Sequence, residues 1–374
     1  MRILKIVLCV ACVFCAKGYA GEPPSIRVAI IQDAPSLALR IGGFFVVMDE
    51  RGTILYRGRE IKTTVTSYKN GIAFGAKTFA KKRVLVKADD PDSLSINGKK
   101  FRGLLRFIKN PDGRFLVVNE IGLEDYIRGI LYHEVSHYWP PEALKAQAIT
   151  SRTYALYQIR ENKGRDFDVT SDVYSQVYGG RTSERFRTNK AVDETQGMAI
   201  LYQGKVIPAY YHATCAGHTE DASNLWNTDM PPLKGVPCSF CKGSPHFSWH
   251  YVADLDEIRI ALIKAGQRIG PIKSISVIAR NPSGRVARLS ISDAEKTLEL
   301  SGKDLRSALG HGLIRSANFS VRLAGADAIF EGTGWGHGAG MCQWGAYFMA
   351  KQGKSAEEIL AYYYPGTNVT LIGF

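Results

Sequence analysis

Residues 126–156 of the 374-residue chain read YIRGILYHEVSHYWPPEALKAQAITSRTYAL, and the fold can be built outward from this stretch. Apolar residues recur at close to helical spacing over residues 123–135. A proline pair then ends this helix, because the residue before a proline is pushed out of the α region. The second proline, Pro141, suits the first turn of another helix, which the pattern extends to about Glu161. A single acid, Glu134, therefore lies at the junction of two predicted helices.

Two cations follow this acid on the second predicted helix. Lys145 and Arg152 are seven residues apart, so they share one edge of the helix beside its apolar stripe. An acid at a helix junction that is faced by two fixed cations suits an anionic substrate. Glu134, Lys145 and Arg152 are therefore candidate site residues, with the two cations as candidate substrate-binding residues.

The same stretch also contains H-E-x-x-H, the signature of zinc metalloproteases, at His133, Glu134 and His137. In that interpretation the histidines bind zinc, and Glu134 is the general base for the metal-bound water. The motif requires both histidines on one continuous helix, whereas the proline pair puts His137 on a fraying last turn. Two alternatives to the catalytic acid thus remain, a zinc metallopeptidase and a surface glutamate with incidental histidines.

The first 20 residues have the pattern of a secretory signal peptide, with Arg2 and Lys5 before an apolar run and small residues at the cleavage site. No later run approaches the roughly 18 apolar residues of a spanning helix, so we expect a secreted or periplasmic protein. The net charge of +13 favours acidic partners. Because the cations are scattered and no nucleic-acid-binding motif occurs, a carboxylate-bearing polymer of the cell envelope fits better than nucleic acid.

Residues 21–118 predict a β-rich N-terminal region. Short, apolar, β-branched runs at 26–31, 43–48, 84–86, 104–108 and 115–118 are separated by turn signals such as Asn97-Gly98. Residues 119–374 mix helical and strand patterns. We therefore predict an α+β protein in which a β-rich scaffold leads into a mixed catalytic region.

A candidate metal site comes from residues 212–241. His212, Cys215 and His218 are followed by Cys238 and Cys241, and such H-x2-C…C-x2-C spacing suits tetrahedral zinc bound by four of the five. A closed set of four ligands would make the zinc structural. A disulfide between Cys238 and Cys241 is the alternative, because oxidising compartments favour disulfides.

Two further segments carry candidate substrate contacts. Gln176 and Tyr178 lie on one side of an aromatic stretch, where they suit contact with sugar. In the C-terminal segment 332–346 five glycines occupy every second position, which leaves the backbone bare for close approach of a ligand. His337 and Gln343 belong to this segment and are predicted to bind substrate.

Several separated motifs together resemble the SpoIID/LytB family, the stage II sporulation protein D type of peptidoglycan lytic transglycosylase. They are YIRGI followed by Glu134, then PEALKAQAITSRTYAL, SQVYGG, YYHATCAGHTE, GWGHGAGMCQWGAY and YYYPGT, in the family's order. By this resemblance Glu134 matches the catalytic acid, and Lys145 and Arg152 match basic residues important for activity. We expect these two cations either to face substrate carboxylates or to hold the geometry of the site. The family also has members that carry metal near the match to His212 and His218. Cys342 departs from the serine that is common at its position.

The resemblance implies cleavage of the bond between N-acetylmuramic acid and N-acetylglucosamine, which leaves 1,6-anhydro-muramic ends. Glu134 would act as both acid and base, with no cofactor in the chemistry. Family members prefer strands stripped of peptide stems, which implies an N-acetylmuramoyl-L-alanine amidase as partner, in cell division or sporulation. A scaffold of the envelope or septum that binds glycan without cutting it is the alternative.

Overall fold

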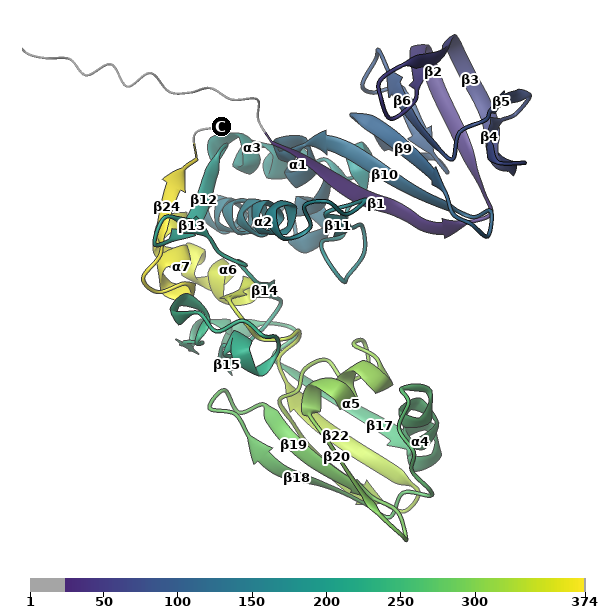
Figure 1. The fold of residues 1–374 in the computed structure, drawn as a ribbon. Coiled ribbons are helices and arrows are strands. Elements are labelled where there is room, and N and C mark those ends of the chain that lie inside the picture. Colours follow the sequence, from purple (N-terminus) through teal and green to yellow (C-terminus); the bar gives the residue numbers. More distant parts are fainter. Residues whose placement is uncertain (1–23, 373–374) are drawn as a thin grey trace, which may run out of the picture.

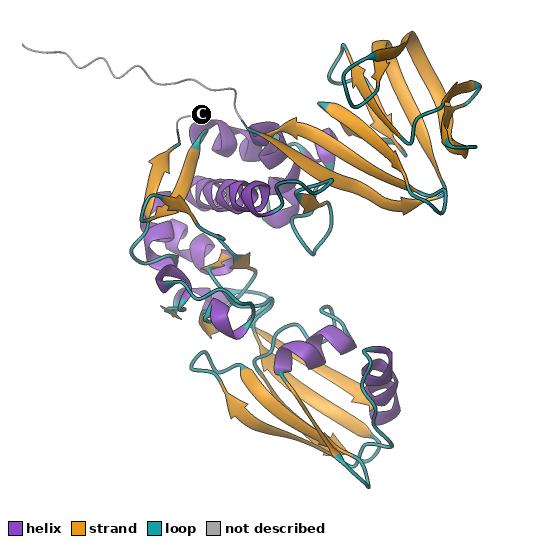
Figure 2. Cartoon of the chain, in the orientation of Figure 1, coloured by secondary structure: helices purple, strands orange, loops and turns teal. Residues whose placement is uncertain are grey.

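The computed structural model describes residues 24–372, so the predicted signal peptide lies outside the described residues. Within that range the chain is α+β, as predicted, with three separate hydrophobic cores. An N-terminal sheet and a second β-rich unit lie at opposite ends of the molecule, with most of the helices between them (Figures 1 and 2). No helix among residues 24–372 combines the length and the apolar character that crossing a membrane requires.

The N-terminal sheet confirms the predicted β-rich region. Its second strand shows why these residues form a half-buried sheet, since Leu37, Leu39 and Ile41 are buried while the residues between them are exposed. The order is β11-β1-β10-β9-β6-β2-β3-β4-β5, with β7 and β8 at its side. The bounds are β1 Ser25–Ala34, β2 Ser36–Met48, β3 Ile54–Tyr68, β4 Gly71–Phe74, β5 Lys77–Phe79, β6 Arg83–Ala88, β7 Leu94–Ile96, β8 Lys99–Phe101, β9 Leu104–Lys109, β10 Phe115–Gly122 and β11 Val169–Thr170.

Three helices follow the sheet, namely α1 (Leu123–Glu134), α2 (Pro141–Glu161) and α3 (Phe186–Glu194). The predicted helix pair is confirmed, including the start of α2 at its proline. One face of α2 packs against the core of the N-terminal sheet through Leu144 and Ala148. Another face packs through Ala146 and Ile149 against a second core, which the C-terminal helices complete. Helix α2 is therefore the shared wall of two cores.

The second core contains both C-terminal helices, α6 (Gln343–Lys351) and α7 (Ala356–Tyr363). A capping box of Ser355 and Glu358, which is a local sequence pattern, opens α7. Small sheets tie this core to the middle of the chain, and their strands are β12 (Met198–Tyr202), β13 (Lys205–Val206), β14 (Tyr211–His212), β15 (Gly217–His218), β16 (Pro237–Cys238), β23 (Met341–Cys342) and β24 (Asn368–Leu371). Parallel pairing of β14 with β23 joins two of the sequence motifs that lie far apart in the chain.

Residues 248–333 form an inserted unit with its own core, a subdivision that the sequence analysis does not predict. The insert leaves and re-enters the rest of the chain at one place, because Ser248 pairs with Thr333 across two adjacent strands. Its elements are β17 (Ser248–Asp254), α4 (Leu255–Lys264), β18 (Ser274–Arg280), β19 (Val286–Ser292), β20 (Thr297–Leu300), α5 (Gly302–Leu309), β21 (Phe319–Ala324) and β22 (Asp327–Thr333).

Candidate active site

A cavity of about 930 Å³ lies where the helices, the paired motifs and the insert meet. Glu134 lines it from the last residue of α1, and Gln343 lines it from the first residue of α6. The rest of the lining includes the aromatic stretch at 173–177, the paired segment at 210–213, the insert at 303–312 and the glycine-rich segment at 335–337. Glu134 is the one carboxyl group among the lining residues that the structure describes.

The position of Glu134 follows from the end of its helix. Val135 takes an extended backbone conformation, so the helix stops one residue before it. Gln343 donates a side-chain hydrogen bond of 3.2 Å to the backbone oxygen of Glu134, which holds this end of α1 against α6. The backbone N–H of Val177 donates to Glu134 Oε1 at 3.3 Å. Gln343 thus holds the backbone of Glu134, and Val177 holds its carboxyl group.

Burial raises the pKa of Glu134 from 4.5 to about 7, although hydrogen bonds with the Tyr211 hydroxyl and with the Val177 backbone lower it in part. A low-dielectric surrounding disfavours the charged form of a carboxyl group. At neutral pH a large share of Glu134 therefore stays protonated and ready to donate a proton. Sequence proximity suggests the aromatic residues Tyr138 and Trp139 as the source of this burial, but Tyr138 is 74% exposed and Trp139 packs on Trp344 instead.

A network of buried polar groups lies behind the carboxyl group. Tyr211 accepts a hydrogen bond of 3.1 Å from the side-chain nitrogen of Gln176, and Gln176 accepts one of 3.0 Å from the Tyr126 hydroxyl. Gln176 also donates to the backbone oxygen of Ser151 on α2. These bonds lock the Tyr211 hydroxyl in place, so Tyr211 positions Glu134.

Two histidines line the cavity beside this network. His212 Nδ1 donates to the Ala339 backbone oxygen at 3.1 Å, whereas His337 Nδ1 accepts from the Ala339 backbone N–H at 3.1 Å. Burial lowers the pKa of His337 to about 3, and it lowers the pKa of His212 well below 6.5. Both rings are therefore neutral at pH 7, and these bonds leave His212 Nε2 as an acceptor and His337 Nε2 as a donor. His212 Nε2 is buried without a partner among the described residues.

The insert supplies a cationic wall. Lys303 and Arg306 of α5 line the cavity together with His311. Arg306 donates its Nε–H to the Ile314 backbone oxygen at 2.9 Å, which orients the guanidinium group. Burial, together with the charge of Arg285, lowers the pKa of Arg306 to about 10, so it remains charged at neutral pH. The cavity therefore combines one acid whose pKa is raised with positive charge that the insert supplies.

The family models that match this chain cover separate parts of it, in agreement with the division between the rest of the chain and the insert. A family model described as Stage II sporulation protein matches residues 111–202, and one described as a domain of unknown function (DUF8618) matches residues 240–340, which include the insert. The chain is 36% identical to an uncharacterized protein of Brachyspira hyodysenteriae, over 81% of this chain and 77% of that protein. It is 34% identical to stage II sporulation protein D of Bacillus amyloliquefaciens, over 68% of this chain and 75% of that protein.

The chain belongs to the SpoIID/LytB family. The amidase enhancer of Bacillus subtilis is also similar, with 27% identity over 74% of this chain and 45% of that protein. Membership of the SpoIID/LytB family supports a cell-wall-related role for the chain. The family motifs that contain Glu134, Tyr211 and His337 meet in the cavity.

The two cations predicted to bind substrate lie elsewhere in this SpoIID/LytB protein. Arg152 has no exposed side-chain surface and forms an ion pair with Glu124, with 2.7 Å between Nη2 and Oε2. Lys145 Nζ pairs with Glu142 and with Glu194, each at 3.0 Å. A glycan cannot touch a fully buried guanidinium group, so the prediction that Arg152 contacts substrate is wrong, whereas its ion pair with Glu124 fits the alternative role of holding geometry. Neither cation lines the cavity around Glu134.

The predictions for Gln176 and Tyr178 as sugar contacts are also corrected. Gln176 is 1% exposed and belongs to the network behind Glu134, and Tyr178 is 4% exposed. The Tyr178 hydroxyl donates to Asn119 at 2.8 Å, and its ring lies so close to Gly129 of α1 that a Cβ there would be 2.4 Å from it. Of the six predicted substrate-binding residues, His337 and Gln343 line the cavity.

The alternating glycines contact the protein's own chain. Gly336 and Gly338 have φ of +109° and +96°, and added Cβ atoms there would lie 2.8 Å from His212 and 2.4 Å from Arg285. A Cβ on Gly340 would lie 1.9 Å from the Tyr210 backbone oxygen. Glycine therefore allows the 332–346 segment to pack against residues 210–215 and the insert. The prediction that these glycines let a ligand approach the backbone is thus corrected to a role in packing within the chain.

The H-E-x-x-H alternative loses its geometric basis. Helix α1 ends at Glu134, three residues before His137, so the two histidines do not lie one turn apart on a continuous helix. His133 Nε2 is within 2.5 Å of the Ser183 hydroxyl.

The cysteines of the predicted metal site do come together, but the fourth member of the group is a residue that the sequence spacing did not indicate. Cys215, Cys238 and Cys241 lie with Cys342, while neither His212 nor His218 belongs to this group.

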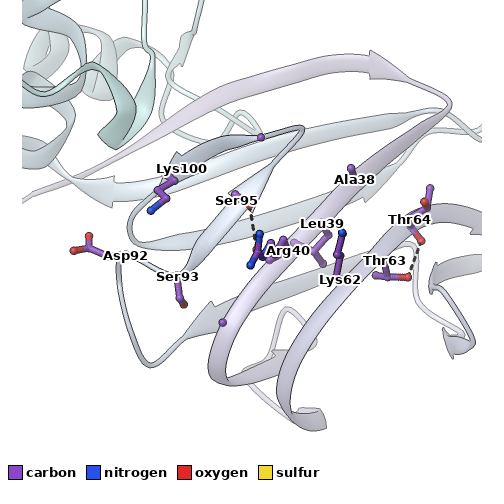
Figure 3. A pocket seen from close by; sticks show the side chains of 12 residues that line it. Ala38, Leu39, Arg40, Lys62, Thr63, Thr64, Asp92, Ser93, Ser95 and Lys100 are labelled. Atoms are coloured by element: carbon purple, nitrogen blue, oxygen red, sulfur yellow. Dashed lines mark hydrogen bonds between the residues drawn. The ribbon is translucent and has the colours of Figure 1, made fainter.

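A second hollow, of about 730 Å³, lies on the N-terminal sheet (Figure 3). Arg40, Lys62 and Lys100 line it, and its one carboxylate, Asp92, pairs with Arg181 at 2.7 Å. The hollow contains no histidine or cysteine and no free acid. The cavity around Glu134 is the candidate active site because it brings a buried acid with a raised pKa together with residues of several family motifs.

The sequence analysis missed Tyr211 and Arg306. Tyr211 belongs to a quoted family motif, but a tyrosine on a short strand carries no sign of which carboxyl group it will contact. Arg306 lies on α5 in the insert, and nothing in the sequence connects that helix to Glu134. Only the fold brings these residues to the cavity.

Proposed function

We propose that this protein is a lytic transglycosylase that cleaves peptidoglycan glycan strands between N-acetylmuramic acid and N-acetylglucosamine. The observation that carries the proposal is a single cavity-lining carboxyl group whose pKa is raised to about 7. A group with a pKa near the working pH is well suited to give a proton and then take one back. As a secreted or periplasmic protein, the chain would meet this polymer in the cell envelope.

In the first step, protonated Glu134 donates its proton to the bridging oxygen of the glycosidic bond. That bond breaks, the N-acetylglucosamine portion leaves with a new hydroxyl group, and positive charge develops at C1 of the muramic ring. In the second step, the Glu134 carboxylate takes the proton of the muramic C6 hydroxyl while O6 bonds to C1. This step forms a 1,6-anhydro ring and restores the protonated acid, so atoms and charge balance without water.

The single carboxyl group fits this route better than hydrolysis. Most glycoside hydrolases use two carboxyl groups, one on each side of the bond, and the second serves as a nucleophile or as a base for water. An internal C6 hydroxyl makes the second group unnecessary. Neutral His212 and His337 suit hydrogen bonds with sugar hydroxyl or acetamido groups, one as acceptor and one as donor.

The cationic wall supports a preference for glycan without peptide stems. Removing a stem from muramic acid exposes its lactyl carboxylate, and Arg306 and Lys303 supply positive charge in the cavity that Glu134 lines. A hydrogen bond between ionised groups contributes about 1.5–3 kcal/mol. An amidase that strips the stems would thus prepare the substrate, and the similarity to an amidase enhancer is consistent with such a partner.

The test is mass spectrometry of the products formed by the purified protein from peptide-free glycan strands. We expect ends of 1,6-anhydro-muramic acid, and a rate at least about 100-fold lower for Glu134→Gln, because a positioned acid–base group contributes about 10²–10⁴. Glu161→Gln is the matched control, since Glu161 is an exposed glutamate at the end of α2. Reducing muramic ends would show hydrolysis instead. Bound but uncut glycan would favour the scaffold function.

A further inference from the structure

Four cysteines form a compact buried cluster at the back of the second core. Their sulfur atoms all lie within 4.8 Å of one another, and each residue is at most 1% exposed. The residues are Cys215, Cys238, Cys241 and Cys342. They are the four cysteines of the chain outside its first 20 residues. One cysteine comes from the segment around residue 215, two come from residues 238–241, and one comes from residue 342. The fold therefore brings sulfur atoms from three separate segments together.

The spacing of the sulfurs matches a tetrahedral metal site. Zinc bound by four thiolates at about 2.3 Å requires sulfur–sulfur separations of about 3.8 Å. Cys215 Sγ and Cys241 Sγ are 3.5 Å apart, and the other pairs fall within the 4.8 Å limit. Two disulfides would divide the four sulfurs into two pairs, and nothing in disulfide chemistry requires those pairs to converge. A shared centre explains the convergence.

The surroundings of the sulfurs are those of thiolates. Backbone N–H groups of Cys215 and Gly345 donate to Cys342 Sγ, each at 3.3 Å, and the Tyr363 hydroxyl lies 3.2 Å from Cys238 Sγ. Cys342 also caps the N-terminus of α6, where the helix dipole favours negative charge. A neutral disulfide sulfur gains little from such donors, whereas a metal-bound thiolate is stabilised by each of them.

A buried cation next to the cluster offsets part of its negative charge. Arg285, 1% exposed, reaches from the insert to donate to the backbone oxygens of Cys215 at 3.1 Å and His218 at 3.0 Å. Zinc with four thiolates has a net charge of −2, and a buried charge needs a partner of the opposite sign. Glu220 accepts hydrogen bonds from Asn281 and Ser283 of the same turn, so the insert is anchored beside the cluster.

We infer that Cys215, Cys238, Cys241 and Cys342 bind one zinc ion in a closed, structural site. Because all four ligands come from the protein, no position is left for water or substrate, and the ion takes no part in the chemistry. Its effect on the active site is positional. Cys342 directly precedes Gln343, which holds the end of α1 at Glu134, and Cys215 lies three residues after His212. This inference does not depend on the proposed function.

The first experiment measures zinc in the purified protein by inductively coupled plasma mass spectrometry, with native mass spectrometry of the intact chain. We expect one zinc per chain and four thiols that react with N-ethylmaleimide only after denaturation and chelation. Cys342→Ser should lower the zinc content at least tenfold. His218→Ala is the matched control and should retain one zinc, because His218 lies outside the cluster. Zinc that is lost in His218→Ala but kept in Cys342→Ser would overturn this ligand set.

A second measurement covers the case in which Cys342→Ser does not fold. Protein refolded with Co²⁺ in place of zinc should show the intense thiolate-to-metal absorption and the d–d bands of tetrahedral Co²⁺ with four sulfur ligands. A chain without bound metal, whose mass is lower by four hydrogens, would show two disulfides and refute the site. Iron in place of zinc, with its visible absorption, would refute the assignment of the metal. Loss of glycan cleavage with zinc still bound would count against the proposed function alone.

Discussion

Arg152 offers the sharpest test of the structure. Its place in the family motif suggests contact with substrate, whereas its burial indicates a structural ion pair. The guanidinium group has no exposed surface and binds both carboxylate oxygens of Glu124, at 2.8 and 2.7 Å. It also donates to the Met198 backbone oxygen at 3.1 Å. Arg152 therefore joins the start of α1 to the middle of α2 and to β12.

Replacing Arg152 by methionine removes the cation and leaves Glu124 charged and 13% exposed. Breaking a buried ion pair on one side costs about 3–5 kcal/mol of unfolding free energy, because the remaining charge has lost its partner. At about 2–4 °C per kcal/mol, the melting temperature of Arg152→Met should fall by roughly 6–20 °C. Calorimetry of the purified variant measures this fall.

The double variant Arg152→Met with Glu124→Met separates the two roles. Removing both charges should recover most of the lost stability, apart from about 1–3 kcal/mol for the Gly197 N–H, which loses Glu124 as acceptor. Glycan cleavage, measured well below the melting temperature, should recover with it. The structural reasoning is refuted if Arg152→Met melts like the parent protein and yet fails to bind or cut glycan.

Three further predictions follow from the cavity and its supports. Folding raises the pKa of Glu134, so the contribution of its protonated form to stability is present below pH 4.5 and is lost as pH rises through about 7. Chemical denaturation should therefore show Glu134→Gln to be as stable as the parent at pH 4. At pH 8 the free energy of unfolding of the variant should be higher than that of the parent by about 3 kcal/mol. Arg306→Gln should lower kcat/KM for peptide-free strands about tenfold and leave kcat/KM for strands with intact stems unchanged. Lys264→Gln, on the other helix of the insert, is the control. Gly338→Ala should melt at a lower temperature than the parent, because its Cβ would lie 2.4 Å from the guanidinium carbon of Arg285 at a φ of +96°; an unchanged melting curve would contradict this packing.

The helix pair could be predicted from sequence because its signals are local. The proline at the start of α2, the apolar spacing and the Ser355–Glu358 capping box each act within a few residues. Glu134 could be nominated for the same reason, since its place at the end of α1 depends on the helix boundary alone.

The environment of each charged side chain could not be predicted in this way. Helical spacing places Arg152 beside an apolar stripe, but its burial depends on Glu124, 28 residues earlier in the chain. The cysteine cluster shows the same limit, because the spacing within 212–241 pointed to nearby histidines. Cys342 reaches the cluster through the pairing of β14 with β23, which joins residues 211–212 to residues 341–342 across the whole insert.

The insert enters and leaves the chain through two adjacent strands, with Ser248 beside Thr333. A unit attached in this way can be gained, lost or exchanged by a single recombination event without breaking any other strand pairing. Since it supplies the cationic wall through Arg306, evolution can alter substrate preference there while Glu134 and its supporting network remain unchanged. The docking of Arg285 beside the cysteine cluster then limits which replacement units are compatible with this core.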